Sequence, residues 1–342
     1  MARAPEIPEE RPLRAPGGWR RWVQSAGYAA LPAVLRDLFT LLFGPPLLSH
    51  SEAPPLLGEE MLWARYAETR SWALKLLQEA ARGVPVPTPK EIARGGSQIG
   101  LYFERLLFWW LEGAGPYTLV AHNLQVHGLR AGRRETLGAF DFILRDRDGT
   151  ALHWELAIKF YLERAASSRW ESWVGPNERD RLDLKLGKIA TQQLPLSSSP
   201  EGVIRLEEVG IHARPVQRAL LRGLFFQRGL RAEGEAAPRP KGAHGACIGR
   251  WFHLRDLPAL FAEVGPARWD FRHRPAWISS IATFDPVPVM GEQALIAEIT
   301  ARLSSKRAVM LSRLSPARES DGLWVEIERI LIVKNGWGDD QR

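Results

Sequence analysis

The chain has 342 residues, enough for two domains or for one large domain with extensions. Hydrophobic residues make up 45% and charged residues 25% of it, a globular composition that excludes a fibrous repeat and global disorder. The single cysteine, Cys247, excludes an internal disulfide and a site with several thiolate ligands. We therefore expect a protein of the reducing cytoplasm.

The net charge is +7, from 46 Lys and Arg against 39 Asp and Glu, and such a balance favours an anionic partner. Codon bias in a GC-rich genome gives the same result, since only eight of the 46 cations are Lys. The position of these charges along the chain is more informative about a partner than the net charge. Residues 202–255 hold ten Lys or Arg against four Glu, which is +6 of the total.

No stretch of the sequence is expected to cross a membrane. The best candidate, residues 38–51, has 14 uncharged residues and is broken by Pro45 and Pro46, whereas a span needs about 20 apolar residues. The N-terminus also lacks the apolar segment of a secretory signal.

The organisation along the chain predicts five regions. They are a mobile tail (1–18), a helical N-terminal region (19–90), an α/β core (91–230), a flexible loop rich in Ala, Gly and Pro (231–246), and a mixed α/β C-terminal region (247–342). In the C-terminal region we expect short strands at 249–254, 269–271, 277–284 and 324–333 and one helix at 292–303.

The core shows the order αβββαβ. An apolar helix (98–112) precedes three strands rich in β-branched and aromatic residues, at 117–126, 135–146 and 151–162. The turn Asp146-Arg-Asp-Gly149 joins the last two as a hairpin. A helix (177–194) and a strand (203–213) follow, with a further strand at 218–226. We expect an α/β (α+β) fold with helices covering the sheet.

Two of these strands carry ionisable residues on otherwise apolar or small faces. Side chains two apart share a face of a strand, so Glu155 and Lys159 lie together, and the hairpin brings Asp141 beside them. Charges on such a face are costly unless they are paired or bind a metal. Spacing alone leaves two interpretations open: a divalent cation site, in which the carboxylates hold the metal and the ammonium stabilises phosphate charge, or a salt bridge between Lys159 and one carboxylate.

Glu104, in the middle of the apolar helix, also has two interpretations. It either joins the carboxylates of the strands or lies exposed beside Arg105 on the solvated side of the helix.

Several of these residues match the pattern of a known superfamily. The run Gly100-Leu-Tyr-Phe-Glu104, Asp141 in one strand and Glu155-Leu-Ala-Ile-Lys159 in the next resemble the PD-(D/E)XK nuclease superfamily. That resemblance implies a restriction-endonuclease-like αβββαβ core, catalytic roles for Glu104, Asp141, Glu155 and Lys159, and Mg²⁺ or Mn²⁺ held by Asp141 and Glu155. More locally, residues 121–126, 136–142, 153–162 and 175–185 resemble a bacterial family catalogued as domain of unknown function 1853.

One departure from the superfamily pattern concerns the lysine. The superfamily separates its Glu and Lys by two residues, about 6.6 Å along a strand, whereas Glu155 and Lys159 are four residues and about 13 Å apart. Ala157 occupies the intervening position. Either the acid or the lysine has moved, and a non-catalytic descendant is a further alternative.

Two segments are candidates for binding nucleic acid. The helix 177–194 carries a polar stripe that suits a phosphate backbone or is a solvated helix face, since acidic residues lie beside it. The basic stretch after residue 202 is the second candidate. The predicted nucleic-acid-binding residues are Arg181, Lys185, Lys188, Gln192, Arg214, Arg218 and Arg222.

The sequence thus supports two hypotheses. The first is a metal-dependent nuclease acting on DNA or RNA phosphodiesters, with Mg²⁺ or Mn²⁺ favoured over zinc because the ligands are oxygens. The second is a non-catalytic nucleic-acid-binding or assembly protein that keeps a degenerate nuclease-like scaffold.

Overall fold

The computed structural model describes residues 4–51, 54–94, 96, 98–130, 133–231, 237–275, 277–318 and 320–339. Parts of the predicted tail and loop, residues 1–3 and 232–236, lie outside this description. The described residues form twelve α-helices and ten β-strands, which confirms a mixed α/β protein. None of these helices is long and apolar enough to cross a membrane.

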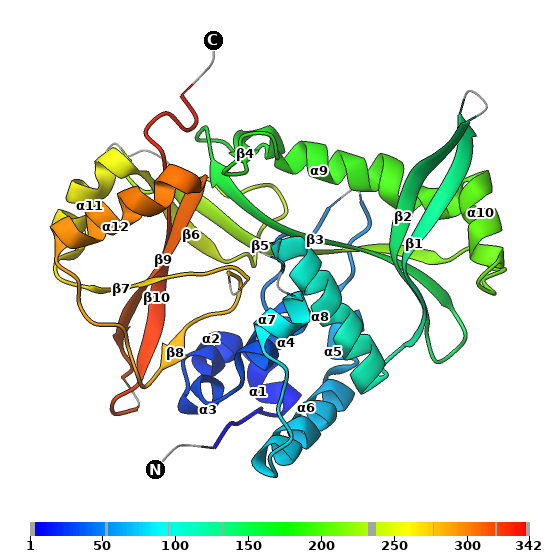
Figure 1. The fold of residues 1–342 in the computed structure, drawn as a ribbon, viewed down its shortest axis with the longest axis horizontal. Helices are drawn as coiled ribbons and strands as arrows, with labels where there is room; N and C mark the ends of the chain where they lie inside the picture. The colour runs from blue at the N-terminus through cyan, green and yellow to red at the C-terminus, as the bar shows by residue number, and fades with distance from the viewer. Residues whose placement is uncertain are drawn as a thin grey trace.

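A helical region precedes the sheet (Figure 1). Its helices are α1 (Glu10–Arg14), α2 (Gly18–Val23), α3 (Ala26–Ala29), α4 (Ala33–Phe43), α5 (Glu59–Trp63), α6 (Tyr66–Ala81), α7 (Pro89–Ala93) and α8 (Ile99–Ala114). The later helices are α9 (Leu182–Lys188), α10 (Pro200–Glu207), α11 (Leu257–Val264) and α12 (Glu292–Ser305).

One mixed sheet runs through the molecule. Its strands lie in the order β1 (Thr118–Arg130), β2 (Arg133–Arg145), β3 (Ala151–Glu163), β5 (Val216–Arg228), β6 (Ile248–His253), β10 (Trp324–Val333), β9 (Ala308–Pro316) and β7 (Arg268–Phe271). Two short strands, β4 (Trp173–Val174) and β8 (Ala282–Thr283), pair with β3 and β10. The strands after residue 247 therefore extend the same sheet that the core strands begin.

Helices cover both faces of this sheet. Alternation along β3 places Trp154 and Ile158 in a large apolar cluster with α4, α6 and α8. The opposite face, with Ala157 and Tyr161, packs against α9. Farther along the sheet, α11 and α12 pack on β9 and β10. Glu155, which alternates with Trp154, consequently faces α9.

The order αβββαβ occurs in the structure, but its last strand is β5, at the position of the further strand predicted at 218–226. The helix α8, the strands β1 to β3, a helical segment and β5 follow one another, with the short β4 inserted before the helical segment. The turn between β2 and β3 forms where predicted, and the Gly149 N–H donates to the Asp146 carbonyl at 3.0 Å.

The strand predicted at 203–213 is wrong, because the helix α10 occupies its first half. The Ser199 hydroxyl accepts a hydrogen bond from the Gly202 N–H at 3.0 Å, and Pro200 fills the first helical position, both of which favour a helix start. The β-branched Val203 and Ile204, which suggested a strand, are 41% and 57% exposed.

The helix predicted at 177–194 begins later and is irregular. Its α-helical part is α9, followed by a π-helical turn (Ile189–Gln193) and a 3₁₀ turn (Leu194–Ser198). Before it, Asn177 accepts hydrogen bonds from the backbone of Arg179 and Asp180, which forms a turn. This irregular segment packs on the face of β3 that carries Glu155.

The C-terminal region follows its sequence pattern in part. The strand predicted at 324–333 coincides with β10, and the helix predicted at 292–303 is α12. The strand predicted at 277–284 is largely wrong, since only β8 forms there, and β9 and α11 were not predicted.

Gly223 fixes the close approach of β5 and β3. Its φ is +138°, and a Cβ at this position would lie 1.7 Å from the Lys159 carbonyl oxygen. We expect Gly223→Ala to lower the free energy of unfolding by about 3 kcal/mol or more, because backbone strain adds to a clash with backbone. Gly187 of α9 is the matched control, since a Cβ there would have nothing within 4 Å. There Gly187→Ala should raise stability by up to about 1 kcal/mol. Denaturant titration of both variants tests this, and an equal, small effect at the two sites would contradict it.

Candidate functional site

The paired strands β2 and β3 separate at two acidic residues. Their backbone ladder ends at the pair Phe142 and Trp154, so the next opposed pair would be Asp141 and Glu155. Instead of backbone pairing, the Leu156 N–H donates to Asp141 Oδ2 at 2.9 Å, and the Asp141 N–H contacts Glu155 Oε1 at 3.5 Å. Side-chain oxygens thus replace carbonyls where the ladder opens.

Beyond this point the two strands have different neighbours. Among the described residues, β2 continues toward its N-terminal end paired with β1 alone, whereas β3 continues paired with β5. The π and 3₁₀ turns after α9 contact β2, and the 3₁₀ turn also contacts β3 and β5. The acids therefore lie between a diverging strand pair and an irregular helical segment.

Glu155 is held by side chains from both elements. It is 1% exposed. Its Oε1 lies 2.9 Å from His153 Nε2, and its Oε2 accepts a hydrogen bond from the Gln193 amide. The other ring nitrogen of His153 lies 3.2 Å from the Ser197 hydroxyl. Both oxygens of Glu155 consequently have partners inside the protein.

A lysine of α9 provides the positive charge of the site. Lys185 Nζ donates to the Gln193 side-chain oxygen at 2.9 Å, and the charges of Asp141 and Glu155 both act on it. Gln193 therefore bridges this ammonium and the Glu155 carboxyl group.

The ionisation of these groups is strongly perturbed. Burial, reinforced by the charge of Glu155, raises the pKa of Asp141 to about 7. Burial also raises the pKa of Glu155 to about 7, against hydrogen bonds from Asp141 and Gln193. Burial lowers the pKa of Lys185, helped by the nearby Lys159 and opposed by the two acids. Perturbed groups clustered in this way are characteristic of functional sites.

Lys159 was predicted to act beside Asp141 and Glu155, but it pairs with a different acid. Its ammonium forms an ion pair with Asp180, whose other oxygen lies 3.5 Å from the Tyr161 hydroxyl. Lys159 lies on the same strand face as Glu155, as predicted, but its partner is an acid outside the pair. Lys185, predicted to contact nucleic acid, is instead the lysine coupled to Asp141 and Glu155.

Glu104 approaches from the other side of the sheet. It lies on α8, and its Oε1 is 2.9 Å from His122 Nε2 of β1. The His122 ring stacks on Phe142 with centroids 4.8 Å apart. The charge of Glu104 still raises the pKa of Asp141, so the three predicted acids form one electrostatic group.

The predicted nucleic-acid stripe of α9 does not form a uniform surface. Arg181 pairs with Asp183 through two hydrogen bonds of 2.6 and 2.7 Å. Lys185 faces the acids, while Lys188 and Gln192 are exposed. Only the last two offer side chains to a partner without rearrangement.

The three arginines predicted around β5 also separate. Arg214 is exposed and lines a pocket with Ser198 and His212, and Arg218 donates to the Gln217 carbonyl at 2.8 Å. Arg222 is 3% exposed and donates to the carbonyls of Leu41 and Leu42 at the end of α4. Its guanidinium satisfies helix C-terminal carbonyls, so the structure contradicts a surface role for Arg222.

Asp141 and Glu155 are the residues of this site that could hold a divalent cation. Among the described residues, no group of three or more His, Cys, Asp or Glu side chains is arranged to hold a metal. Mg²⁺ commonly takes one or two carboxylates and completes its shell with water and substrate phosphates. Asp141 and Glu155 are two carboxyl groups that could act in this way once they lose their protons, which they retain to about pH 7.

Comparison with models of known protein families identifies the family of this chain. The model of a family described as "Domain of unknown function (DUF1853)" matches residues 36–333. The chain belongs to this family. Searches of curated proteins and of solved structures found no match. The DUF1853 match contains Asp141, Glu155 and Lys185, and its description states no activity.

The sequence pattern did not indicate that Gln193 contacts Glu155 or that Lys185 is coupled to the two acids. The helical period places Gln193 on the apolar side, because a regular α-helix sets residues 185 and 193 about 80° apart around the axis. The π turn rotates less per residue and brings Gln193 to Lys185. His153 shares its strand face with Glu155 in the sequence, and that spacing was the available signal for their contact.

The raised pKa of Asp141 predicts a stability change with a definite sign. An unfolded Asp loses its proton near pH 4, whereas the folded group keeps it to about pH 7. The folded state binds more protons in this window, so the free energy of unfolding falls as pH rises through it. Asp141→Asn should therefore raise the thermal midpoint at pH 8 and change it little at pH 4.

Asp183 is the control, because its hydrogen bonds with Arg181 lower its pKa. Asp183→Asn should give no gain at pH 8. Thermal unfolding of both variants without divalent cations tests the assignment, and destabilisation of Asp141→Asn at pH 8 would refute it.

Proposed function

We propose that this chain is a nuclease that hydrolyses nucleic-acid phosphodiesters with the help of Mg²⁺ or Mn²⁺. The observation that carries the proposal is the opening of the sheet at Asp141 and Glu155, where two carboxyl groups with raised pKa values meet the ammonium of Lys185. The resemblance to the PD-(D/E)XK superfamily supports the same chemistry.

Each group has a role that follows from its position. Asp141 and Glu155 would hold the cation, which when bound supplies a Lewis acid for the phosphodiester. Lys185, kept in place by Gln193, would stabilise the negative charge that develops on the phosphate. His153 and Gln193 orient Glu155 through its two oxygens, and Glu104 adds negative charge from the opposite side of the sheet.

The proposal assigns the lysine role to Lys185, with Lys159 kept as an ion-pair partner of Asp180. Lys185→Met should lower metal-dependent cleavage about 10²–10³-fold, the usual effect of removing one group that stabilises transition-state charge. Lys159→Met, the matched control, should lower it less than tenfold. Cleavage of labelled DNA and RNA in Mg²⁺ and Mn²⁺ measures both effects. A larger loss from Lys159→Met would return the role to Lys159.

Cation binding provides a test that does not depend on knowing the substrate. Calorimetric titration of the wild-type chain with Mn²⁺ at pH 8 should show one site, which Asp141→Asn and Glu155→Gln abolish while Asp183→Asn retains it. Binding should weaken below about pH 7, because the carboxyl groups then hold protons. Equal Mn²⁺ binding by all four proteins would exclude the carboxylate pair as the metal site.

A second candidate function rests on the burial of Glu155. Both of its oxygens are engaged by protein groups and it is 1% exposed, a state in which no ligand is needed. This favours a non-catalytic nucleic-acid-binding or assembly protein. Undiminished nucleic-acid binding by Asp141→Asn, together with no cleavage by the wild type in either cation, would select this second function.

A further inference from the structure

The divergence of β2 from β3 leaves a two-stranded ribbon beyond the acids. We define the ribbon as residues 123–130 of β1 and 133–138 of β2. Figure 1 shows β1 and β2 extending from the body of the molecule beside α10. The pairing of β1 with β2 continues to Arg130 and Arg133.

The end of the ribbon is exposed and positively charged. Residues 123–138 contain three arginines and one glutamate. Arg133 and Arg134 are exposed, and neither guanidinium has a partner within the described part of the chain. Leu129 is paired with Arg134 across the two strands and is 79% exposed. Exposure of an apolar side chain such as Leu129 to water is unfavourable, so its position near cations favours contact with a partner.

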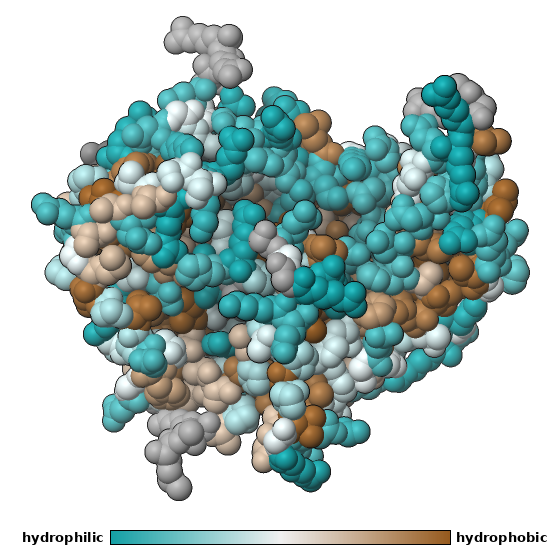
Figure 2. Space-filling view, in the orientation of Figure 1, coloured by the Kyte–Doolittle hydropathy of each residue, from teal (hydrophilic) through white to brown (hydrophobic). Residues whose placement is uncertain are grey.

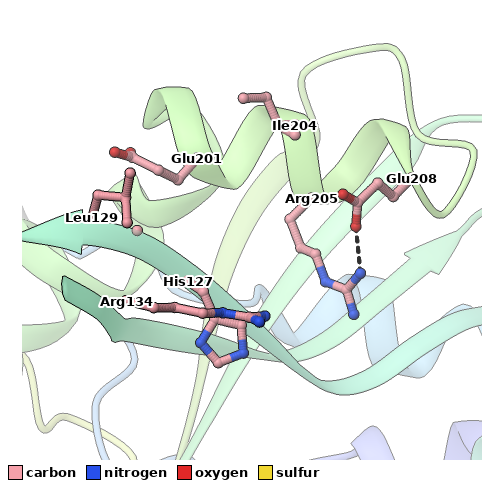
Figure 3. A pocket seen from close by; sticks show the side chains of 8 residues that line it. His127, Leu129, Arg134, Glu201, Ile204, Arg205 and Glu208 are labelled. Atoms are coloured by element: carbon pink, nitrogen blue, oxygen red, sulfur yellow. Dashed lines mark hydrogen bonds and ion pairs between the residues drawn. The ribbon is translucent and has the colours of Figure 1, made fainter. Parts of the chain in front are cut away.

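A pocket of about 600 Å³ lies between the ribbon and α10, which are also joined by a hydrogen bond of 3.1 Å from Arg205 Nε to the Gln125 carbonyl. Figure 3 shows His127 and Arg134 on the ribbon opposite Arg205 and Glu208 of the helical segment, which pair with each other. With Glu201 on the same wall, the charges of the pocket nearly balance. Arg134 is one of the charges of this pocket, and the ribbon as a whole carries a net charge of +2 from its three arginines and one glutamate. The space-filling view shows apolar and polar groups mixed on this side of the molecule (Figure 2).

A two-stranded ribbon is an element that the major groove of duplex DNA admits. A two-stranded β-ribbon fits the major groove of B-DNA, about 12 Å wide, where arginines contact guanine or phosphate and apolar side chains contact the thymine methyl group. The narrow major groove of an RNA duplex does not admit it. Seven residues separate Asp141 from Arg134, about 24 Å along a strand, which corresponds to about seven base pairs at 3.4 Å each.

We propose that the ribbon is a DNA-binding arm that enters the groove of double-stranded DNA about seven base pairs from the phosphate held at Asp141 and Glu155. The position of that phosphate rests on the proposed function, whereas the binding of DNA by the ribbon does not.

The test measures binding separately from cleavage. Full-length Asp141→Asn protein, without divalent cations, is titrated with a labelled 24-base-pair DNA duplex, the corresponding single strand and an RNA duplex of the same length. We expect the DNA duplex to bind most tightly. In the same background, Arg133→Ala/Arg134→Ala should weaken duplex binding about tenfold or more near 0.1 M salt and reduce the salt slope by about 2, since each phosphate contact contributes about 0.9.

Two further variants control for charge and contact. Arg11→Ala/Arg82→Ala removes the same charge from the exposed surface of the N-terminal helical region and should change affinity less than twofold. Leu129→Ser should weaken duplex binding with no change in the salt slope. Equal effects of the two double variants, or tighter binding of single strands or of the RNA duplex, would overturn the proposal.

The outcomes separate this inference from the proposed function. Duplex binding that depends on the ribbon, without cleavage by the wild type, would retain the arm and reject the nuclease. Cleavage by the wild type with unchanged duplex binding in the Arg133→Ala/Arg134→Ala variant would do the reverse.

Discussion

The site depends on the requirement that the backbone groups of a sheet be hydrogen-bonded even where two strands part. At Asp141 and Glu155 the strands β2 and β3 separate, and the freed N–H of Leu156 is satisfied by the Asp141 carboxyl group. An acidic side chain therefore has a structural role at the same point where the proposed function gives it a chemical one. Because the acid replaces a backbone acceptor, its oxygen is fixed by the sheet.

The cost of this arrangement is the burial of two carboxyl groups, and the surrounding residues reduce it in two ways. Protonation removes the charge below about pH 7. Above that pH, the ammonium of Lys185 and the hydrogen bond from Gln193 act on the negative charge. A buried charge left without such partners destabilises a fold, so the irregular segment after α9 is needed by the strands that it covers.

Local patterns predicted the elements that carry the acids, and tertiary contacts decided the rest. Alternating residues and the turn at Gly149 were sufficient to predict β2 and β3, and therefore the shared face of Asp141 and Glu155. The sequence could not indicate that Lys159 would pair with Asp180, because that partner lies across an irregular turn. Nor could the 3.6-residue period identify Gln193, which reaches Lys185 through a π turn. The strand predicted at 203–213 failed because the cap at Ser199 outweighed β-branched side chains that remain exposed.

The folded structure changes the interpretation of where positive charge is concentrated along the sequence. Residues 202–255 carry most of the net charge in the sequence, yet several of those arginines are engaged inside the protein. Arg222 binds carbonyls of α4, Arg231 pairs with the buried Glu163, and Arg250 pairs with Glu263 and Glu328. An arginine that satisfies internal acceptors contributes little to recognising a phosphate. The cations near the end of the ribbon are fewer, but Arg133 and Arg134 are exposed and extend from the strand that carries Asp141. Local exposure and connection to the acids, more than the total charge of a segment, therefore decide where an anionic polymer would bind.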